Sequence, residues 1–158
     1  WAGLKFFNVY GPREAHKGRM ASVAFHAWNQ VRERGRVRLF AGGRPGQGDG
    51  EQQRDFVFVG DCLEHMLWFR RHREVRGIFN SGTGRARTFN DLARAVFAAL
   101  GRPERIEYFP MPEDLRDKYQ DYTRAETAKL ARAGWEGGAT PLEQGVESYV
   151  RWLEENRI

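Results

Sequence analysis

The sequence has 158 residues, 41% of them hydrophobic and 30% charged, which is typical of one globular domain and excludes a disordered chain. No apolar run approaches the ~20 residues of a membrane helix, so no membrane partner is expected. The single cysteine, Cys62, excludes an internal disulfide, argues against a metal site and favours the cytoplasm. The net charge of +5 favours an anionic partner, either nucleic acid, a nucleotide or a phosphorylated metabolite.

The first part of the chain alternates between strand and helix patterns. The apolar run Leu4–Val9 predicts a buried strand that ends at Tyr10-Gly11-Pro12. A helix is expected to follow and to end at Gly35, and Val37–Ala41 is expected to form a second strand. The apolar stripe that predicts this helix consists of Met20, Val23, Ala24, Ala27, Trp28 and Val31.

A polar, glycine-rich loop, Gly42–Gln53, is predicted next. It does not end in the Gly-Lys-Ser/Thr of a P-loop, so a phosphate-cradling P-loop is excluded. Arg54–Asp61 predicts a strand whose last residue caps a helix. The buried face of that helix is expected to contain Leu63, Met66 and Leu67.

The strand predicted at Gly77–Asn80 leads into a Gly-Thr-Gly turn. This turn either binds a dinucleotide or packs strand against helix, and packing is favoured because Arg87 occupies the place of the third glycine. Thr88 and Asp91 predict a capping box at the start of a helix that Gly101 closes.

The last elements are a strand at Ile106–Phe109, a short helix at Ala125–Ala133 and a final helix capped by Thr140 with Glu143. The apolar seam of the final helix consists of Leu142, Val146, Tyr149, Val150 and Leu153. Strands that alternate with helices of this length predict an α/β fold with parallel strands.

The long turn after the first strand is the strongest candidate site. In folds of this class ligands lie beyond the carboxyl ends of the strands, where Asn8–Arg19 is expected. Lys17 stands there among Arg13, His16 and Arg19, and such neighbours disfavour its protonated form, so a fraction could accept a proton. An exposed loop lysine without a role is the alternative.

Three other candidates each have two interpretations. Arg54, at the mouth of a strand, would bind a diphosphate bidentately or pair with Asp55 or Asp61. His26 lies off the apolar stripe and would contact an anion or remain solvated. Tyr119 would hydrogen-bond a ligand or cover an edge of the core.

Four stretches, in this order, resemble the C-terminal half of the ADP-L-glycero-D-manno-heptose 6-epimerase family, a branch of the extended short-chain dehydrogenase/reductases. They are FFNVYGPREAHKGRMASVAFH, RDFVFVGD, GIFNSGTG and KYQDYT. The resemblance covers nearly the whole chain. The runs GPRE-x-HKG-x-MASV-x-FH and YQ-x-x-T are specific to this family, whereas RDFV-like stretches occur widely among the extended enzymes.

The resemblance implies the C-terminal part of an extended Rossmann-type fold with an α/β substrate-binding subdomain. Residues 1–18 and 55–85 would complete a Rossmann sheet, and residues 19–54 and 86–158 would form the subdomain. The N-terminal NADP-binding half would be absent, since the sequence has neither a Gly-x-x-Gly-x-x-Gly fingerprint nor a Tyr-x-x-x-Lys motif. The full-length protein is expected to be a homo-oligomer.

The implied chemistry is inversion of one carbinol centre of ADP-heptose, for the heptose of the lipopolysaccharide core. Hydride passes to NADP, a ketone forms, and hydride returns to the opposite face. The two acid/base groups would be the tyrosine of the missing motif and Lys17. Val9 and Lys17 would contact NADP. The ADP-sugar would be lined by Asn8, Arg19, His26, Phe40, Ala41, Gly42, Gly43, Arg54 and Tyr119.

Two departures from the family pattern concern the substrate edge of this site. Arg19 stands where the family often has a serine, and Phe40-Ala41-Gly42-Gly43 only partly matches Phe-Glu-Gly-Ser. The isolated chain is expected to be inactive and to unfold or aggregate, because it would carry an unpaired sheet edge and an exposed apolar face.

Two alternatives remain. One is another extended nucleotide-sugar epimerase or dehydratase, most of which lack the HKG turn. The less favoured alternative is a basic nucleic-acid-binding module, against which the aromatic residues lie in predicted buried strands rather than on a basic surface.

Overall fold

The computed structural model describes residues 1–43, 46–116 and 119–156 and confirms the α/β class. The strands are β1 (Ala2–Phe6), β2 (Asn8–Tyr10), β3 (Val37–Phe40), β4 (Gln53–Arg54), β5 (Phe56–Phe58), β6 (Gly77–Ser81), β7 (Arg87–Thr88) and β8 (Ile106–Phe109). The helices are the 3-10 segment η1 (Ala15–Met20), α1 (Val23–Arg34), α2 (Val59–Arg71), α3 (Phe89–Ala99), α4 (Glu113–Arg116), α5 (Ala128–Arg132) and α6 (Leu142–Glu155). The pairs β1–β6, β2–β5 and β3–β8 are parallel, and β4–β7 is antiparallel.

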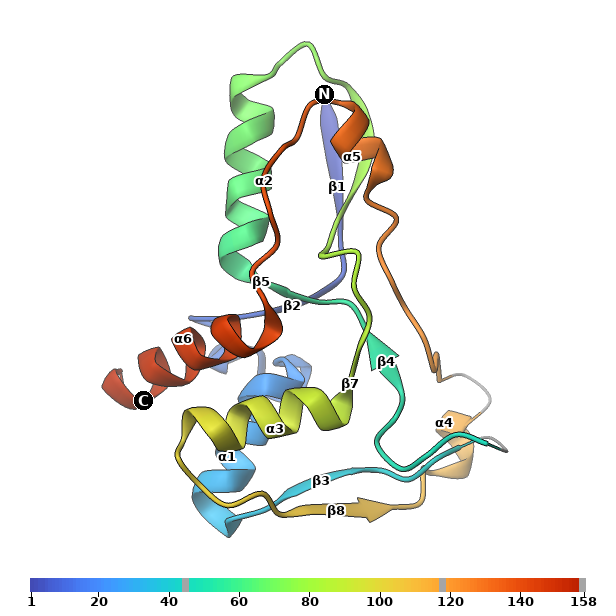
Figure 1. Cartoon of the computed structure of the whole chain (residues 1–158), viewed down its shortest axis with the longest axis vertical. Coiled ribbons are helices and arrows are strands. Elements are labelled where there is room, and N and C mark those ends of the chain that lie inside the picture. Colours follow the sequence, from blue (N-terminus) through green and yellow to red (C-terminus); the bar gives the residue numbers. More distant parts are fainter. Residues whose placement is uncertain (44–45, 117–118, 157–158) are drawn as a thin grey trace.

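The elements gather in two groups, one at each end of the molecule (Figure 1). At one end, α2 and α5 pack on the β1–β6 pair around a small core of Trp68, Phe79 and Leu130. At the other end, α1, α3 and α6 surround a larger core beside the β3–β8 pair. The β2–β5 pair lies between the two groups, and its strand ends are the place where the sequence predicts a ligand.

The predicted end of α1 at Gly35 is confirmed, whereas its start lies at Val23, later than the apolar stripe indicated. The Ser22 hydroxyl caps its first turn by accepting from Phe25 N at 3.2 Å, and Gly35 ends it in the left-handed conformation with φ 66°. Its buried residues are Ala24, Ala27, Trp28 and Val31. The inclusion of Met20 is wrong, since this side chain is 84% exposed in η1, where non-helical backbone at Gly18 interrupts the turn.

The predicted burial of the first strand is wrong in part. The run divides at Phe7 into β1 and β2, and Phe6 is 46% exposed. In the described residues β1 pairs only with β6, so no further strand covers its other edge.

The predicted buried face of α2 is also wrong. Leu63, Met66 and Leu67 are 52%, 50% and 42% exposed. The helix buries the opposite side instead, which contains Asp61, Cys62, His65 and Trp68. The chain as described therefore presents an apolar helix face to solvent.

Long-range partners replace two of the predicted helix caps. Helix α2 begins at Val59, so Asp61 lies in its first turn, where the carboxylate accepts from Thr140 N at 3.0 Å and Thr140 Oγ1 at 2.6 Å. Thr140 consequently does not cap α6, and Glu143 pairs with Arg87 at 2.6 Å.

Two other predictions from the second half of the chain are confirmed. Thr88 and Asp91 form the capping box of α3. The apolar seam of α6 is buried: Leu142, Val146, Tyr149, Val150 and Leu153. Among the residues described, no helix has the length and apolar character needed to span a membrane.

Candidate functional site

One cavity brings together three of the predicted site residues. Asn8, Val9 and Lys17 line a hollow of about 260 Å³ at the end of β2. Its other walls come from the first turn of α1, from Phe56 of β5 and from Leu92 of α3. The cavity thus lies along β2 and includes Asn8 and Lys17 in its lining.

The turn of residues 11–22, called the Lys17 turn below, has an irregular backbone. Arg13 adopts a left-handed φ of 69°, and Gly18 has φ 54°. Lys17 N donates to the carbonyl oxygen of Glu14 at 2.9 Å, and Ala21 N donates to Gly18 O at 3.1 Å. Lys17 itself is exposed, as are Arg13 and His16, so the turn displays several cations beside the cavity.

Glu14 is a residue that sequence reasoning missed. It is 4% exposed, and its carboxylate accepts hydrogen bonds from Gly11 N, Ser22 N and Ser22 Oγ. The sequence signal for Glu14 is one acidic residue within a run of cations, because such a carboxylate needs hydrogen-bond donors if the turn folds back on itself.

Arg54 forms the centre of a second group of site residues. Its side chain is buried, and its Cζ lies 4.9 Å from the ring centroid of Tyr119 and 5.6 Å from that of Phe89. Nη1 donates to the carbonyl oxygen of Gln53 at 2.8 Å. The guanidinium plane is therefore held between aromatic rings.

The alternative that pairs Arg54 with Asp55 or Asp61 is wrong. No ion pair joins these described side chains, because each carboxylate has other partners. Asp55 accepts from Thr83, Gly84 and Ala125 and so holds the Gly-Thr-Gly turn beside the start of β5, whereas the packing interpretation predicted contact between strand and helix.

Tyr119 joins Arg54 to the Phe40 segment. Burial raises the pKa of the Tyr119 phenol, the charge of Arg54 opposes that rise, and Asp121 adds to it. The Tyr119 ring packs edge-on against Phe40 with 5.7 Å between centroids. Phe40, Arg54 and Tyr119 therefore lie together, as a shared binding site requires.

The glycines after Phe40 are engaged within their own loop. Gly42 N donates to Asp49 Oδ1 at 2.8 Å, and Gly43 N donates to Gln47 Oε1 at 3.1 Å. Asn90, another residue that sequence reasoning missed, is buried in α3 and donates to Asp49 O at 2.8 Å. An asparagine inside the first turn of a helix with a Thr-Asp capping box is the signal that could have indicated it.

His26 and Arg19 are not brought into either group. His26 is half-buried on α1 beside Phe25, and Arg19 is exposed on η1. Neither lines the 260 Å³ cavity.

Aromatic packing connects the cavity residues (Asn8, Val9 and Lys17) with the second group of site residues (Phe40, Arg54 and Tyr119). Phe56 pairs with Asn8 across β2–β5 and lines the cavity, and its ring lies edge-on to Phe89 at 5.6 Å. Phe89 in turn lies beneath the Arg54 guanidinium. Phe56 and Phe89 therefore connect the wall of the cavity to Arg54 by side-chain packing.

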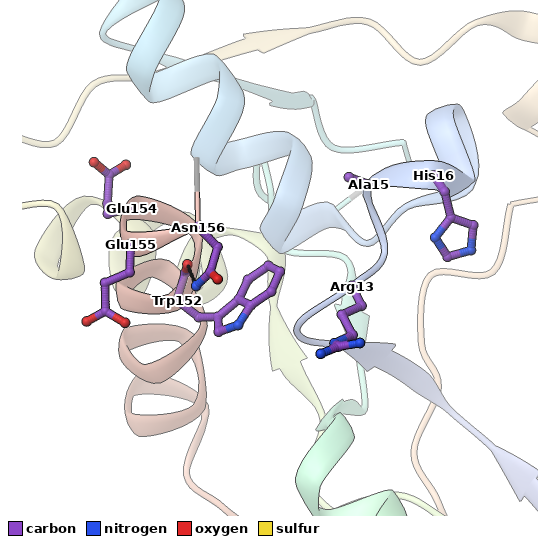
Figure 2. Close-up of a pocket in the computed structure, with 7 residues that line it drawn as sticks. All are labelled: Arg13, Ala15, His16, Trp152, Glu154, Glu155 and Asn156. Carbon is purple, nitrogen blue, oxygen red and sulfur yellow. Dashed lines mark hydrogen bonds between the residues drawn. The ribbon is translucent and has the colours of Figure 1, made fainter. Parts of the chain in front are cut away.

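A larger hollow, of about 1010 Å³, lies between the Lys17 turn and the end of α6 (Figure 2). Its described lining residues are Arg13, Ala15, His16, Trp152, Glu154, Glu155 and Asn156. None of them is a predicted site residue, and Figure 2 shows Glu154 and Glu155 directed away from the turn. The smaller cavity, which contains the predicted residues, is therefore the candidate site.

Comparison with known proteins identifies the class of protein that carries this fold and site. Residues 1–82 match the NAD dependent epimerase/dehydratase family, and the chain belongs to that family. An ADP-L-glycero-D-manno-heptose-6-epimerase of Alkalilimnicola ehrlichii is 54% identical over 148 residues, which are 94% of this chain and 46% of the relative. The chain spans about half the length of the curated relatives it matches, which confirms the resemblance over that part.

Solved structures of nucleotide-sugar epimerases share the fold. The Helicobacter pylori ADP-L-glycero-D-manno-heptose-6-epimerase superposes with a TM-score of 0.78 at 26% identity, over 97% of this chain and 44% of that one. The Thermus thermophilus UDP-glucose 4-epimerase, in complex with NAD, gives a TM-score of 0.79 at 28% identity, over 100% and 47%.

Proposed function

We propose that this chain is the C-terminal, substrate-binding half of an NADP-dependent ADP-L-glycero-D-manno-heptose 6-epimerase. The full-length enzyme would convert ADP-D-glycero-D-manno-heptose into the L-glycero epimer for the lipopolysaccharide core. The observation that carries the proposal is the shared cavity of Asn8, Val9 and Lys17 at the end of β2. The relative with 54% identity supports the choice of substrate.

The residues present fit only the reactive end of a nicotinamide dinucleotide. The cavity of about 260 Å³ is below the roughly 300–1,000 Å³ that encloses a drug-sized ligand, and the sequence has no glycine fingerprint for the pyrophosphate. Val9 offers an apolar wall, and the Lys17 amine offers a hydrogen-bond donor. NADP, held mainly by an N-terminal half, would supply the hydride acceptor and donor.

Lys17 would exchange a proton with the reacting sugar hydroxyl. When hydride leaves the carbinol carbon, the hydroxyl proton must pass to a base, and an acid must supply a proton to the carbonyl oxygen when hydride returns. Lys17 is exposed at the cavity, so its amine can approach a bound sugar. The other face of the sugar would be served by the tyrosine of the N-terminal half, and Asn8 would hold the sugar through its side-chain amide.

Arg54 would bind the diphosphate of the ADP-sugar. A guanidinium has five N–H donors, and the contact with Gln53 O engages only one of its nitrogens. The rings of Tyr119 and Phe89 pack against the group, and its remaining N–H donors would bind two phosphate oxygens. Residues 40–43 would line the same end of the substrate, and Arg19 on η1 and His26 on α1, which lie outside both groups of site residues, would contact the ADP-sugar from elsewhere on its surface.

The proposal extends to the organisation and setting of the full-length protein. Residues 1–18 and 55–85 would complete the Rossmann sheet, and residues 19–54 and 86–158 would form the substrate-binding subdomain. Helix α5 lies against the first of these units, because Leu130 packs with Phe79 of β6. We place the enzyme in the cytoplasm, as a homo-oligomer, and the free thiol of Cys62 supports a reducing compartment.

The test is Lys17→Met in the full-length protein. Loss of a positioned acid/base group should lower epimerisation by about 10²–10⁴-fold, while ADP-sugar affinity stays within a few-fold. Arg13→Met, in the same turn but outside the cavity lining, is the matched control and should be nearly neutral. A wild-type rate for Lys17→Met would refute the role of Lys17. Turnover of UDP-glucose but not ADP-heptose would favour another nucleotide-sugar epimerase.

A further inference from the structure

Glu14 is a buried carboxylate within an exposed, cationic turn. Its side chain is 4% exposed, although Arg13, His16 and Lys17 around it are exposed. A carboxylate removed from water is costly unless hydrogen bonds replace its hydration. The structure therefore needs a set of donors for Glu14, and these donors show what the residue does.

The donors come from both ends of the segment Gly11–Ser22. Oε2 accepts from Ser22 N at 2.7 Å, and Oε1 accepts from Ser22 Oγ at 2.6 Å and from Gly11 N at 3.4 Å. Ser22 is also the N-terminal cap of α1, through Phe25 N. One carboxylate thus ties the start of the turn to its end and to the first turn of a buried helix.

The position of Glu14 is fixed from the core side as well. It lines the Lys17 cavity and also a smaller hollow of about 60 Å³, whose walls include Tyr149 and Trp152 of α6. Burial, together with the charge of Glu14, raises the pKa of the Tyr149 phenol. Glu14 therefore stands between the α6 packing and the cavity.

The rest of the turn is loosely packed. A Cβ added at Gly18 would meet no atom within 4 Å, and η1 buries none of its residues. The path of the main chain at Lys17 depends on its hydrogen bond to the Glu14 carbonyl oxygen. A movement of Glu14 would thus carry Lys17 with it.

We propose that Glu14 is a positioning residue whose carboxylate closes the Gly11–Ser22 turn and holds Lys17 at the cavity. This inference rests on the proposed function for the part that concerns catalysis. Glu14 itself acts through Lys17 and needs no contact with substrate. A misplacement of a catalytic group by about 1 Å can cost on the order of 10²-fold in rate, so the effect should be large.

The experiment is Glu14→Gln in the full-length protein, alone and combined with Lys17→Met. Glutamine keeps the size but directs an NH₂ group at a donor of Ser22, so the turn should open. We expect kcat to fall by about 10–100-fold with KM within threefold, and Glu14→Gln to change the rate of Lys17→Met by less than about twofold. Equal losses in both backgrounds would overturn the proposal, because they would show a purely structural role. Glu64→Gln, at an exposed site on α2, is the control.

A second measurement is independent of activity. Hydrogen exchange of the Lys17 and Ala21 amides, which are bonded within the turn, should accelerate in Glu14→Gln, while the amides of α3 keep their rates. Unchanged exchange would overturn the closure of the turn by Glu14. If wild type fails to epimerise ADP-heptose, the proposed function falls, and the exchange result still decides the role of Glu14. Should Glu14→Gln not fold, Ser22→Ala removes the bond from Ser22 Oγ to Glu14, together with the cap bond from Phe25 N, and should lower kcat several-fold.

Discussion

The guanidinium of Arg54 lies over the ring of Tyr119, with its Cζ 4.9 Å from the ring centroid. Replacing Arg54 with Lys keeps the charge but removes the planar face and the bidentate fork. We therefore expect Arg54→Lys in the full-length protein to weaken ADP-sugar binding by about tenfold or more, with kcat changed only a few-fold. Steady-state kinetics and calorimetric titration with ADP measure the two effects.

Two controls accompany this substitution. Tyr119→Phe keeps the ring beneath the guanidinium and should weaken binding less than Arg54→Lys. Arg124→Lys, at an exposed position, should leave binding unchanged. An unaltered affinity for ADP in Arg54→Lys would exclude Arg54 from the diphosphate site.

Helices with local signals could be predicted from the sequence, whereas their distant partners could not. Gly35 ends α1 and Thr88 with Asp91 opens α3 as predicted, because these contacts form within one turn of the chain. Thr140 instead donates to Asp61, 79 residues away, and no local sequence pattern predicts this partner. The long-range contact with Asp61 therefore replaces the predicted cap of α6.

The same distinction applies to the site. The position of Asn8, Val9 and Lys17 beside one cavity follows from the rule that ligands meet strand ends, so it could be predicted. The closure of the turn by Glu14 depends on a fold-back onto Ser22, and the stacking of Arg54 depends on Phe89 from another element. Such contacts appear only once the chain is folded.

Aggregation of the isolated chain should occur through the exposed apolar face of α2. Leu63, Met66 and Leu67 form an exposed apolar strip on α2, and Ile78 of β6 is also exposed. The isolated chain should aggregate, and Leu63→Gln combined with Met66→Gln should reduce that aggregation in light scattering. If the strip is covered in the full-length protein, the same change should lower its Tm. A monodisperse chain with a cooperative melt would contradict the prediction.

The buried His65 should make the folded protein less stable as the pH falls. Its buried ring lies with Nδ1 2.8 Å from Ser81 Oγ, and burial lowers its pKa, although the charge of Asp61 opposes the shift. The unfolded chain therefore takes up a proton below about pH 6.5 that the folded state resists, so stability present above this pH is lost as the pH falls.

Urea denaturation of the full-length protein between pH 7.5 and 5 measures this contribution. His65→Gln should show a flatter decline of the urea midpoint than wild type. His16→Gln, at an exposed site in the Lys17 turn, should keep the wild-type slope. Equal slopes for wild type and His65→Gln would assign the acid sensitivity to other groups.

Replacing Gly145 of α6 with alanine should destabilise the protein, although alanine usually favours a helix more than glycine does. A Cβ at Gly145 of α6 would overlap the hydroxyl of Tyr10, which is buried and donates to Leu142 O at 3.4 Å. Overpacking costs about 1–3 kcal/mol, which exceeds the roughly 0.5–1 kcal/mol that Ala gains over Gly inside a helix. Gly145→Ala should therefore lower the free energy of unfolding by about 1–2 kcal/mol.

A double-mutant cycle locates the cause of that loss. Tyr10→Phe removes the hydroxyl, so Gly145→Ala should lose most of its cost in this background. Gly138→Ala is the matched control, because a Cβ there would meet no atom within 4 Å, and it should be neutral. If Gly145→Ala costs as much in the Tyr10→Phe background as in wild type, the loss does not come from the Tyr10 hydroxyl but from the contacts of the added Cβ with the ring of residue 10 and with Phe58.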